Sequence, residues 1–237
     1  MISTGTQRLP VVAIDGPAGA GKSTLAAHLA RRFGLLNLES GAMYRALALK
    51  AIENDLDLGD ESAMADLTAS TRIELSPTVD GNRVRLDGTD VTRRLRDEDV
   101  TQAASVVSVH PRVRRWMADE QRKLGTQGGV VMEGRDIGTV VFPDAEVKIF
   151  LDAAPEVRGN RRFQQAAAQP AVTEESVLRE IRDRDQRDRS RATAPLVAAP
   201  DAVTIDSTKM SLDEVIAAAE AIVLQHLRVA PAPQTRA

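Results

Sequence analysis

The sequence predicts an α/β fold of three layers, in which helices cover both faces of a parallel β-sheet. Two observations lead to this prediction. Short runs rich in Val, Ile and Leu, typical of strands buried on both faces, recur along the whole chain. Between them stand longer stretches whose apolar residues return at helical spacing. Strands that alternate with helices pair in parallel, because each helix crosses over the sheet to start the next strand.

The predicted elements follow in a regular order. The first strand, at residues 11–14, is a β-branched run, and the first helix, at residues 22–33, ends before Gly34. The other core strands are predicted at residues 35–38, 129–132, 147–151 and 202–205. The other long helices are predicted at residues 40–54, 97–108, 111–124, 155–168, 173–191 and 212–227. We expect one domain over residues 1–228 and a flexible tail at residues 229–237.

One region departs from this alternation. A short helix near residues 62–69 precedes two short strands at residues 73–75 and 83–86, and the turn Asp80-Gly81-Asn82 between the strands predicts a hairpin. The sequence therefore predicts a small α+β insert at about residues 60–102.

The composition excludes several classes of function. The chain has no cysteine, which excludes disulfides, cysteine-ligated metals and a catalytic thiol. Its six aromatic residues offer little for stacking on bases, so we expect no nucleic-acid partner. No apolar run approaches the ~20 residues that span a bilayer, and the N-terminus lacks the apolar stretch of a secretory signal. We therefore expect a cytoplasmic protein that acts on small molecules and contacts no membrane. We also expect a monomer, because the sequence shows no exposed apolar stripe or heptad for a partner.

A phosphate-binding loop stands between the first strand and the first helix. Its sequence, Gly-Pro-Ala-Gly-Ala-Gly-Lys-Ser, matches the pattern G-x-x-x-x-G-K-[S/T] without a mismatch. The glycines let backbone N–H groups turn inward around a polyphosphate, and the start of the helix adds partial positive charge. Lys22 is expected to reach the β- and γ-phosphates, and the Ser23 hydroxyl to ligate Mg²⁺. The triphosphate site is assigned to Gly16, Pro17, Ala18, Gly19, Ala20, Gly21, Lys22, Ser23 and Thr24, with Mg²⁺ as cofactor.

The residues around this loop favour a small-molecule kinase. The chain lacks the Asn-Lys-x-Asp motif of regulatory GTPases, and its candidate strand ends in a single Glu where mechanical ATPases carry paired acids. Nine of the 37 residues at 155–191 are Arg, and Arg184, Asp188 and Arg191 share one helix face. A phosphate acceptor needs its negative charge neutralised, whereas a hydroxyl acceptor needs a base. The arginine cluster therefore favours a phosphate acceptor and predicts a lid at about residues 154–191 that closes positive charge over the phosphates.

Two other functions stay open on these residues alone. One is a kinase of the same loop class that acts on a hydroxyl of a small metabolite, with Asp15 or Asp152 as the catalytic base. The other is a nucleotide-gated regulatory module, which would hydrolyse slowly and bind a protein partner.

Eight segments together resemble bacterial cytidylate kinases, a family of nucleoside-monophosphate kinases in the P-loop NTPase superfamily. The most specific is Glu133-Gly-Arg-Asp-Ile-Gly-Thr-Val-Val-Phe-Pro-Asp144. The others are Ile14-Asp-Gly-Pro-Ala-Gly-Ala-Gly-Lys-Ser-Thr24, Leu38-Glu-Ser-Gly-Ala-Met-Tyr-Arg45, Ala103-Ala-Ser105, Pro111-Arg-Val-Arg114, Lys148-Ile-Phe-Leu-Asp-Ala153, Arg184-Asp-Gln-Arg-Asp-Arg-Ser-Arg191 and Pro195-Leu. They run in order, so the resemblance covers nearly the whole chain. It implies a five-stranded parallel core, a monophosphate-binding insert, a mobile lid, and transfer of phosphate from ATP to CMP or dCMP.

The resemblance also implies how the base is read. Cytosine donates at N4 and accepts at N3 and O2, so a carboxylate beside an arginine complements its edge. Asp136 and Arg114 would take these parts, with Ser40 and Ser105 adding contacts and Tyr44 beneath the base. Uracil would leave buried groups unpaired, at a cost of roughly 1–3 kcal/mol each.

The phosphates are assigned to arginines in the same way. Arg45, Arg135 and Arg191 would hold the CMP phosphate, Arg184 would bridge to the transferring oxygens, and Asp188 would accept from a sugar hydroxyl. The ATP phosphates are assigned to Arg158, Arg161 and Arg162, and the catalytic residues are Lys22, Arg162, Arg184 and Arg191. The chain departs from the family pattern at Glu39, where Asp is expected, and at Glu133, where some members have Asp. Glu133 is therefore assigned to the metal only through a bound water.

Overall fold

A five-stranded parallel sheet forms the centre of the computed structural model, which describes residues 9–78, 81–166 and 173–229. The strands lie in the order β2-β6-β1-β7-β8, and every neighbouring pair is parallel. Their bounds are β1 (Val11–Asp15), β2 (Leu36–Glu39), β6 (Val130–Gly134), β7 (Val147–Asp152) and β8 (Val203–Asp206). The predicted α/β fold with a parallel core is confirmed. Because the strands are parallel, all their carboxyl ends meet at one edge of the sheet, where ligands bind in such folds.

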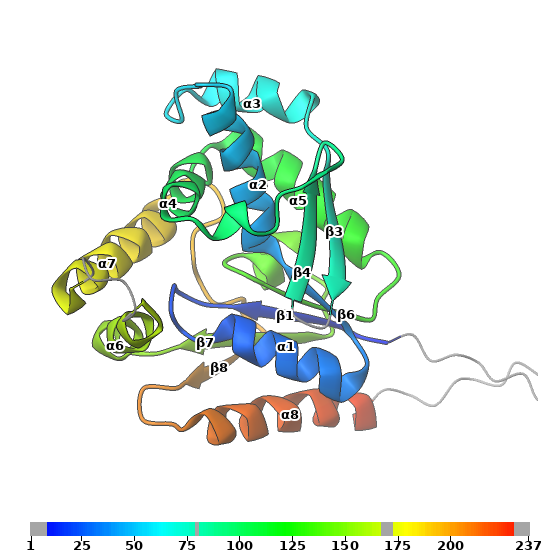
Figure 1. The fold of residues 1–237 in the computed structure, drawn as a ribbon. Helices are drawn as coiled ribbons and strands as arrows, with labels where there is room; N and C mark the ends of the chain where they lie inside the picture. The colour runs from blue at the N-terminus through cyan, green and yellow to red at the C-terminus, as the bar shows by residue number, and fades with distance from the viewer. Residues whose placement is uncertain (1–8, 79–80, 167–172, 230–237) are drawn as a thin grey trace, which may run out of the picture.

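Helices cover both faces of this sheet (Figure 1). α1 (Lys22–Phe33) and α8 (Leu212–Val229) lie on one face, where Leu25, Leu29 and Val223 pack against strand residues such as Ile14 in one apolar cluster. α2 (Ser40–Glu53) and α5 (Pro111–Gly125) lie on the other face. There Ala118 of α5 packs with β-strand residues in a second cluster, so the sheet is buried on both sides as its apolar strands predicted.

The chain between α2 and α5 forms a small α+β unit. It contains α3 (Glu61–Ala69), an antiparallel sheet of β3 (Ile73–Thr78), β4 (Gly81–Leu86) and β5 (Thr89–Asp90), the 3₁₀ turn η1 (Arg94–Arg96) and α4 (Glu98–Val107). The sequence had not indicated β5 or η1. Asp80 of the predicted turn lies outside the described residues. The side chain of Asn82 ties this unit to β2, since it donates to the carbonyl of Asn37 at 2.7 Å and accepts from the Glu39 N–H at 2.8 Å.

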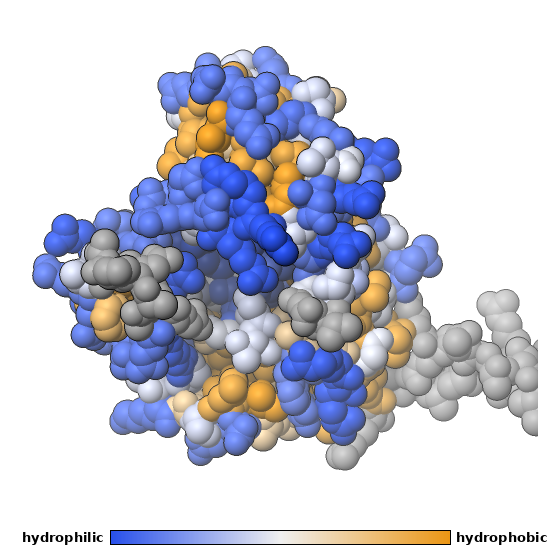
Figure 2. Space-filling model, viewed as in Figure 1, coloured by the Kyte–Doolittle hydropathy of each residue, from blue (hydrophilic) through white to orange (hydrophobic). Residues whose placement is uncertain are grey.

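Two arginine-rich helices stand beyond the carboxyl ends of β7 and β1. They are α6 (Pro155–Ala166) and α7 (Glu174–Ser190), and Thr173 caps the start of α7 by accepting from the Ser176 N–H. The predicted end of the first of these helices, at residues 167–168, lies outside the described residues, as do residues 230–237 of the predicted tail. Hydrophilic side chains dominate the part of the surface that these helices form (Figure 2). Within the described residues no helix combines the length and the apolarity that crossing a bilayer requires.

Candidate functional site

The glycine-rich loop joins β1 to α1 at the carboxyl edge of the sheet, as predicted. Gly16 has a φ of 149°, and a Cβ added there would lie 2.0 Å from the carbonyl oxygen of Leu151, so only glycine fits. Gly21, at a φ of 100°, ends the loop where α1 begins. The Lys22 ammonium is buried and donates to the carbonyl of Pro17 at 2.7 Å. Burial, reinforced by the positive charge of Arg135, lowers the pKa of Lys22 to about 7.

This loop opens onto a cavity of about 800 Å³ that also reaches α2, α4, α5 and α7. All the residues assigned from the sequence line this cavity except Gly16, Pro17 and Arg158. The structure thus gathers side chains that are up to 173 positions apart in the sequence, from Ala18 to Arg191. Their individual roles stay predictions.

One end of the cavity holds a buried pair of opposite charges. Nη2 of Arg114, on α5, lies 2.6 Å from Oδ2 of Asp136, which follows β6. The guanidinium of Arg114 also lies 5.5 Å from the ring centroid of Tyr44, and its Nε is buried without a partner. Burial raises the pKa of Tyr44 to about 12, so the phenol stays neutral. An arginine with a spare donor beside a carboxylate, over an aromatic ring, suits the polar edge of a planar base.

Ser40 and Ser105 border the same end but have partners already. The Ser40 hydroxyl donates to the carbonyl of Glu133 at 2.6 Å. The Ser105 hydroxyl accepts from Nε of Arg187 at 3.2 Å, and Arg187 was not among the predicted site residues. This contact joins α4 to α7.

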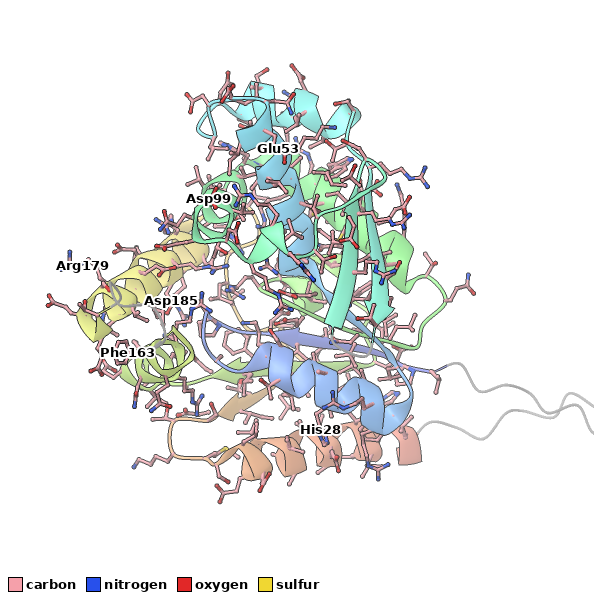
Figure 3. The ribbon with its side chains drawn as sticks, in the orientation of Figure 1. His28, Glu53, Asp99, Phe163, Arg179 and Asp185 are labelled. Atoms are coloured by element: carbon pink, nitrogen blue, oxygen red, sulfur yellow. The ribbon has the colours of Figure 1, made fainter. Side chains whose placement is uncertain are left out.

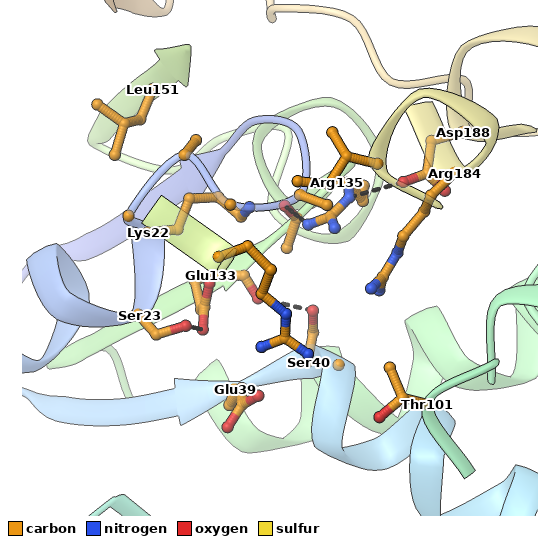
Figure 4. Close-up of a pocket in the computed structure, with 18 of the residues that line it drawn as sticks. Lys22, Ser23, Glu39, Ser40, Thr101, Glu133, Arg135, Leu151, Arg184 and Asp188 are labelled. Atoms are coloured by element: carbon orange, nitrogen blue, oxygen red, sulfur yellow. Dashed lines mark hydrogen bonds and ion pairs between the residues drawn. The ribbon is translucent and has the colours of Figure 1, made fainter. Parts of the chain in front are cut away.

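Arginines converge on the middle of the cavity, as Figure 4 shows. Nε of Arg135 donates to Oδ2 of Asp188 at 2.8 Å, and Nη1 of Arg191 donates to Oδ1 of the same residue at 3.2 Å. Burial alone would raise the pKa of Asp188, but Arg135, Arg191 and Arg184 outweigh it and hold this pKa below the usual value. Asp188 is therefore an ionised carboxylate that holds two of the arginines in place.

Several donors in this cluster are left over for a ligand. Nη2 of Arg191 and Nε of Arg45 are buried and unpartnered. Arg184 points into the cavity in Figure 4, and burial together with the charge of Arg135 lowers its pKa to about 10. Buried positive charge without enough negative charge beside it is costly, so the cluster is built to receive an anion.

An oxygen-rich pocket beside the loop fits a hard cation. The Ser23 hydroxyl donates to Oε1 of Glu133 at 2.5 Å. Burial raises the pKa of Glu133, and the nearby carboxylate of Glu39 raises it further, so a positive ion would relieve both effects. Among the described residues no three His, Cys, Asp or Glu side chains form a metal cluster. The donors present suit Mg²⁺, which binds one or two protein oxygens and completes its shell with water and phosphate oxygens.

Sequence reasoning missed residues at both ends of the cavity. Glu39 lines it and binds Nη2 of Arg45 through Oε1 at 2.5 Å; the sequence marked Glu39 only as a departure from the family pattern and gave it no role in the site. Leu95, Arg96 and Thr101 line it from η1 and α4. Ser207, Met210, Leu212 and Val215 line it from the start of α8 and the turn before it. Nothing in the sequence pattern predicts that Ser207, Met210, Leu212 and Val215 belong to the site. They line the cavity because the chain returns to it after β8.

A short π-helical turn that no pattern predicted, η2 (Ile137–Val141), directly follows Asp136. The carboxylate of Asp15 accepts from the N–H groups of Ile137 and Gly138 at 2.8 and 2.7 Å. Burial raises the pKa of Asp15 to about 6, although these two backbone donors act in the opposite direction. Asp15 therefore links the end of β1 to the turn that carries Asp136.

Comparisons with known proteins identify the family to which this chain is similar. Residues 12–225 match the family model described as cytidylate kinase. A cytidylate kinase of Solibacter usitatus is 49% identical over 212 residues, which cover 88% of this chain and 90% of the relative. One of Aeromonas salmonicida is 48% identical, with 93% of this chain and 96% of the relative covered. Among solved structures, a shikimate kinase from Acinetobacter baumannii is similar over 93% of this chain and 94% of its own, at 15% identity and a TM-score of 0.43.

Proposed function

The chain belongs to the cytidylate kinase family, and from this membership and its site we propose that it transfers the γ-phosphate of ATP to CMP or dCMP. The products are ADP and CDP or dCDP. The observation that carries this proposal is the shared cavity, in which a phosphate loop, a cluster of arginines with unpartnered donors and a base-sized Arg114–Asp136 pair meet. Each part fits one piece of the two substrates.

The monophosphate would lie with its base against Arg114 and Asp136. The carboxylate of Asp136 would accept from N4 of cytosine, and Arg114 would donate toward N3 and O2. Tyr44 would pack on the base, and Ser40 and Ser105 would contact its edge. The phosphate would then reach Arg45, Arg135 and Arg191, while Asp188 accepts from a sugar hydroxyl.

The triphosphate would enter from the loop. The backbone N–H groups of the loop would cradle its phosphates, and Lys22 would leave the carbonyl of Pro17 for the phosphate oxygens. Arg161 and Arg162, both at the cavity, would contact the triphosphate, and Arg184 would bridge the donor and acceptor phosphates. Ser23, and Glu133 through a water, would hold Mg²⁺, which would neutralise part of the phosphate charge when bound.

The proposed transfer is direct and in line, without a covalent enzyme intermediate. The arginines and Lys22 lower the barrier by stabilising charge on the transferring group, and an ionised phosphate acceptor needs no base. A stable phospho-enzyme formed with ATP alone would contradict this mechanism.

The two other functions are less well supported. Asp15, one candidate base for a hydroxyl acceptor, is buried and already binds two backbone N–H groups. Asp152, the other candidate, accepts from the N–H of the next residue, Ala153. A regulatory module needs only the triphosphate site. It does not explain why a buried Arg114–Asp136 pair that complements a base shares the cavity with arginines that have unpartnered donors.

We further propose a monomer that works in the cytoplasm.

A coupled assay of ADP release tests the proposed function. With ATP and Mg²⁺, CMP or dCMP should accelerate ADP release far more than UMP, AMP or shikimate does. Acceleration by shikimate would favour the hydroxyl kinase, and no acceleration by any acceptor would favour the regulatory module.

A further inference from the structure

Arg158, on the first turn of α6, lies buried at the junction of three segments and outside the cavity. Its side chain is 2% exposed, and each of its three nitrogens has a partner. Nε donates to the carbonyl of Ala153 at 2.7 Å, Nη1 donates to the carbonyl of Ala18 at 2.9 Å, and Nη2 lies 2.6 Å from Oδ2 of Asp185. All three guanidinium nitrogens of Arg158 thus bind groups of the protein itself.

The contact with Ala18 reaches into the phosphate loop. α6 packs directly against this loop, since a Cβ added to Gly19 would lie 3.2 Å from both Cβ and the carbonyl oxygen of Arg158. The carbonyl next to Ala18, that of Pro17, accepts from Lys22. A polyphosphate in the loop would draw Lys22 away from Pro17 and turn N–H groups toward itself. The Pro17–Ala18 segment is therefore the part of the loop that must adjust when a triphosphate binds.

The contact with Asp185 reaches into the arginine cluster. Figure 3 shows Asp185 on α7 where this helix faces α6. It directly follows Arg184 and precedes Asp188 by one helical turn, and both of these residues line the cavity. The carboxylate of Asp185 is buried, and its other oxygen has no partner, so it depends on Arg158 for its balance of charge.

We propose that Arg158 is a positioning residue that couples the triphosphate site to the monophosphate site. It acts through the carbonyl of Ala18 and the carboxylate of Asp185, and it touches neither nucleotide. Binding in the loop shifts Ala18, Arg158 follows, and Asp185 carries the shift to Arg184 and Asp188. Each nucleotide then tightens the other by the same factor, because coupling between two sites is reciprocal. This inference rests on the proposed function.

The chain offers a matched control for this coupling. Arg182 of α7 pairs with Glu156 of α6 at 2.8 Å, so this pair joins the same two helices. Both side chains are exposed, at 59% and 62%, and neither residue lines the cavity. Arg182→Ala therefore loosens the two helices without cutting the path from the loop to the cluster.

The experiment measures the Kd of CMP by calorimetry, with and without a saturating non-hydrolysable ATP analogue and Mg²⁺. In the natural protein the analogue should tighten CMP by about fivefold or more. The measure of coupling is the ratio of the Kd of CMP without the analogue to the Kd of CMP with it. In Arg158→Lys and Asp185→Asn this ratio should fall to within about twofold of one, while the Kd of CMP without the analogue changes little. Lysine keeps the charge beside Asp185 but cannot supply three donors in one fork. Arg182→Ala should keep the ratio of the natural protein.

Each result decides between coupling and a purely structural role. Melting temperatures identify the variants that fold, and either folded variant suffices. If a folded variant keeps the full ratio, or if the natural protein shows no ratio above one, the coupling is refuted. Failure of the natural protein to bind CMP would instead refute the proposed function.

Discussion

Arg114 and Asp136 form an ion pair whose nitrogen and oxygen lie 2.6 Å apart and whose side chains are 3% and 10% exposed. Such buried pairs contribute little net stability, because removing two charges from water costs about as much as their attraction returns. This pair also keeps a buried, unpartnered donor at Nε of Arg114. Its geometry is therefore better explained by a ligand that both side chains read than by the folding of the chain.

Replacing Asp136 tests this reading of the base. Asp136→Asn puts an amide where we propose that the carboxylate accepts from N4 of cytosine, and the amide N–H₂ can instead donate to O4 of uracil. The ratio of kcat/KM for CMP to that for UMP should fall by roughly 10–100-fold. The KM of ATP should stay within about twofold, since the loop lies elsewhere in the cavity. Steady-state kinetics with both acceptors measures these values.

Asp66→Asn is the matched control for that substitution. Asp66, on α3, pairs at 3.9 Å with Arg112, which lies on α5 as Arg114 does. Asp66 is 76% exposed and lies outside the cavity. This variant should keep the acceptor preference of the natural protein. Full preference for CMP in Asp136→Asn would show that other residues read the base.

Arg191 should be essential for turnover. Its buried Nη2 has no partner and is therefore free to bind the acceptor phosphate that we propose for this part of the cavity. Arg191→Ala should raise the KM of CMP and lower kcat by roughly 100-fold or more, because a donor to the transferring group is lost. Arg189→Ala, two residues away and 49% exposed, should leave both values nearly unchanged. Equal effects of the two variants would show that Arg191 takes no special part in turnover.

Local pattern was enough to predict the core of this fold. The apolar runs at β1, β6 and β7 are buried on both faces, so their hydrophobicity alone predicted parallel strands. The glycine-rich loop was equally clear, because its spacing and its place between a strand and a helix are both local. By contrast, β5 has only two residues and no apolar side chain, and such a strand forms only because β4 offers it a partner.

The site was predictable only where a motif or the family resemblance covered it. The resemblance named Arg114 and Asp136, but no spacing shows that residues on α5 and after β6 meet. The assignment of Arg158 to ATP stays a prediction, and no spacing in the sequence shows the contacts that its three nitrogens make with a loop, a strand end and a helix. Glu39 and Ser207 line the cavity because distant segments of the chain pack together there. Local sequence pattern does not predict such packing.

Magnesium dependence should respond to Glu133. Removing the ion with EDTA should abolish turnover. Glu133→Gln should raise the free Mg²⁺ needed for half the maximal rate by about 10-fold or more, because groups that orient a metal's ligands typically contribute that much. The control is Glu146→Gln, since Glu146 accepts from the Val11 N–H at the opposite end of β1. An unchanged Mg²⁺ requirement in Glu133→Gln would remove Glu133 from the metal site.

The pH dependence of stability should reveal the proton on Asp15. Burial raises its pKa from 3.8 to about 6, so below pH 3.8 both the folded and unfolded chains hold this proton. Between pH 3.8 and about 6 mainly the folded chain holds the proton on Asp15. The stabilisation that this proton gives is lost as the pH rises through about 6. The free energy of unfolding of the natural protein, minus that of Asp15→Asn, should therefore fall by roughly 2 kcal/mol between pH 4 and pH 8. Urea unfolding at each pH gives this difference, in which groups common to both proteins cancel.

Asp201→Asn supplies a control of the opposite sign. The exposed carboxylate of Asp201 accepts from Lys148 at 2.8 Å, and this hydrogen bond holds its pKa below the usual value. A lowered pKa adds stability that is present above the unfolded value and lost only in more acidic solution. The difference between the natural protein and Asp201→Asn should therefore be flat between pH 5 and pH 8. A flat difference for Asp15→Asn as well would mean that Asp15 is ionised throughout this range, held so by the N–H groups of Ile137 and Gly138.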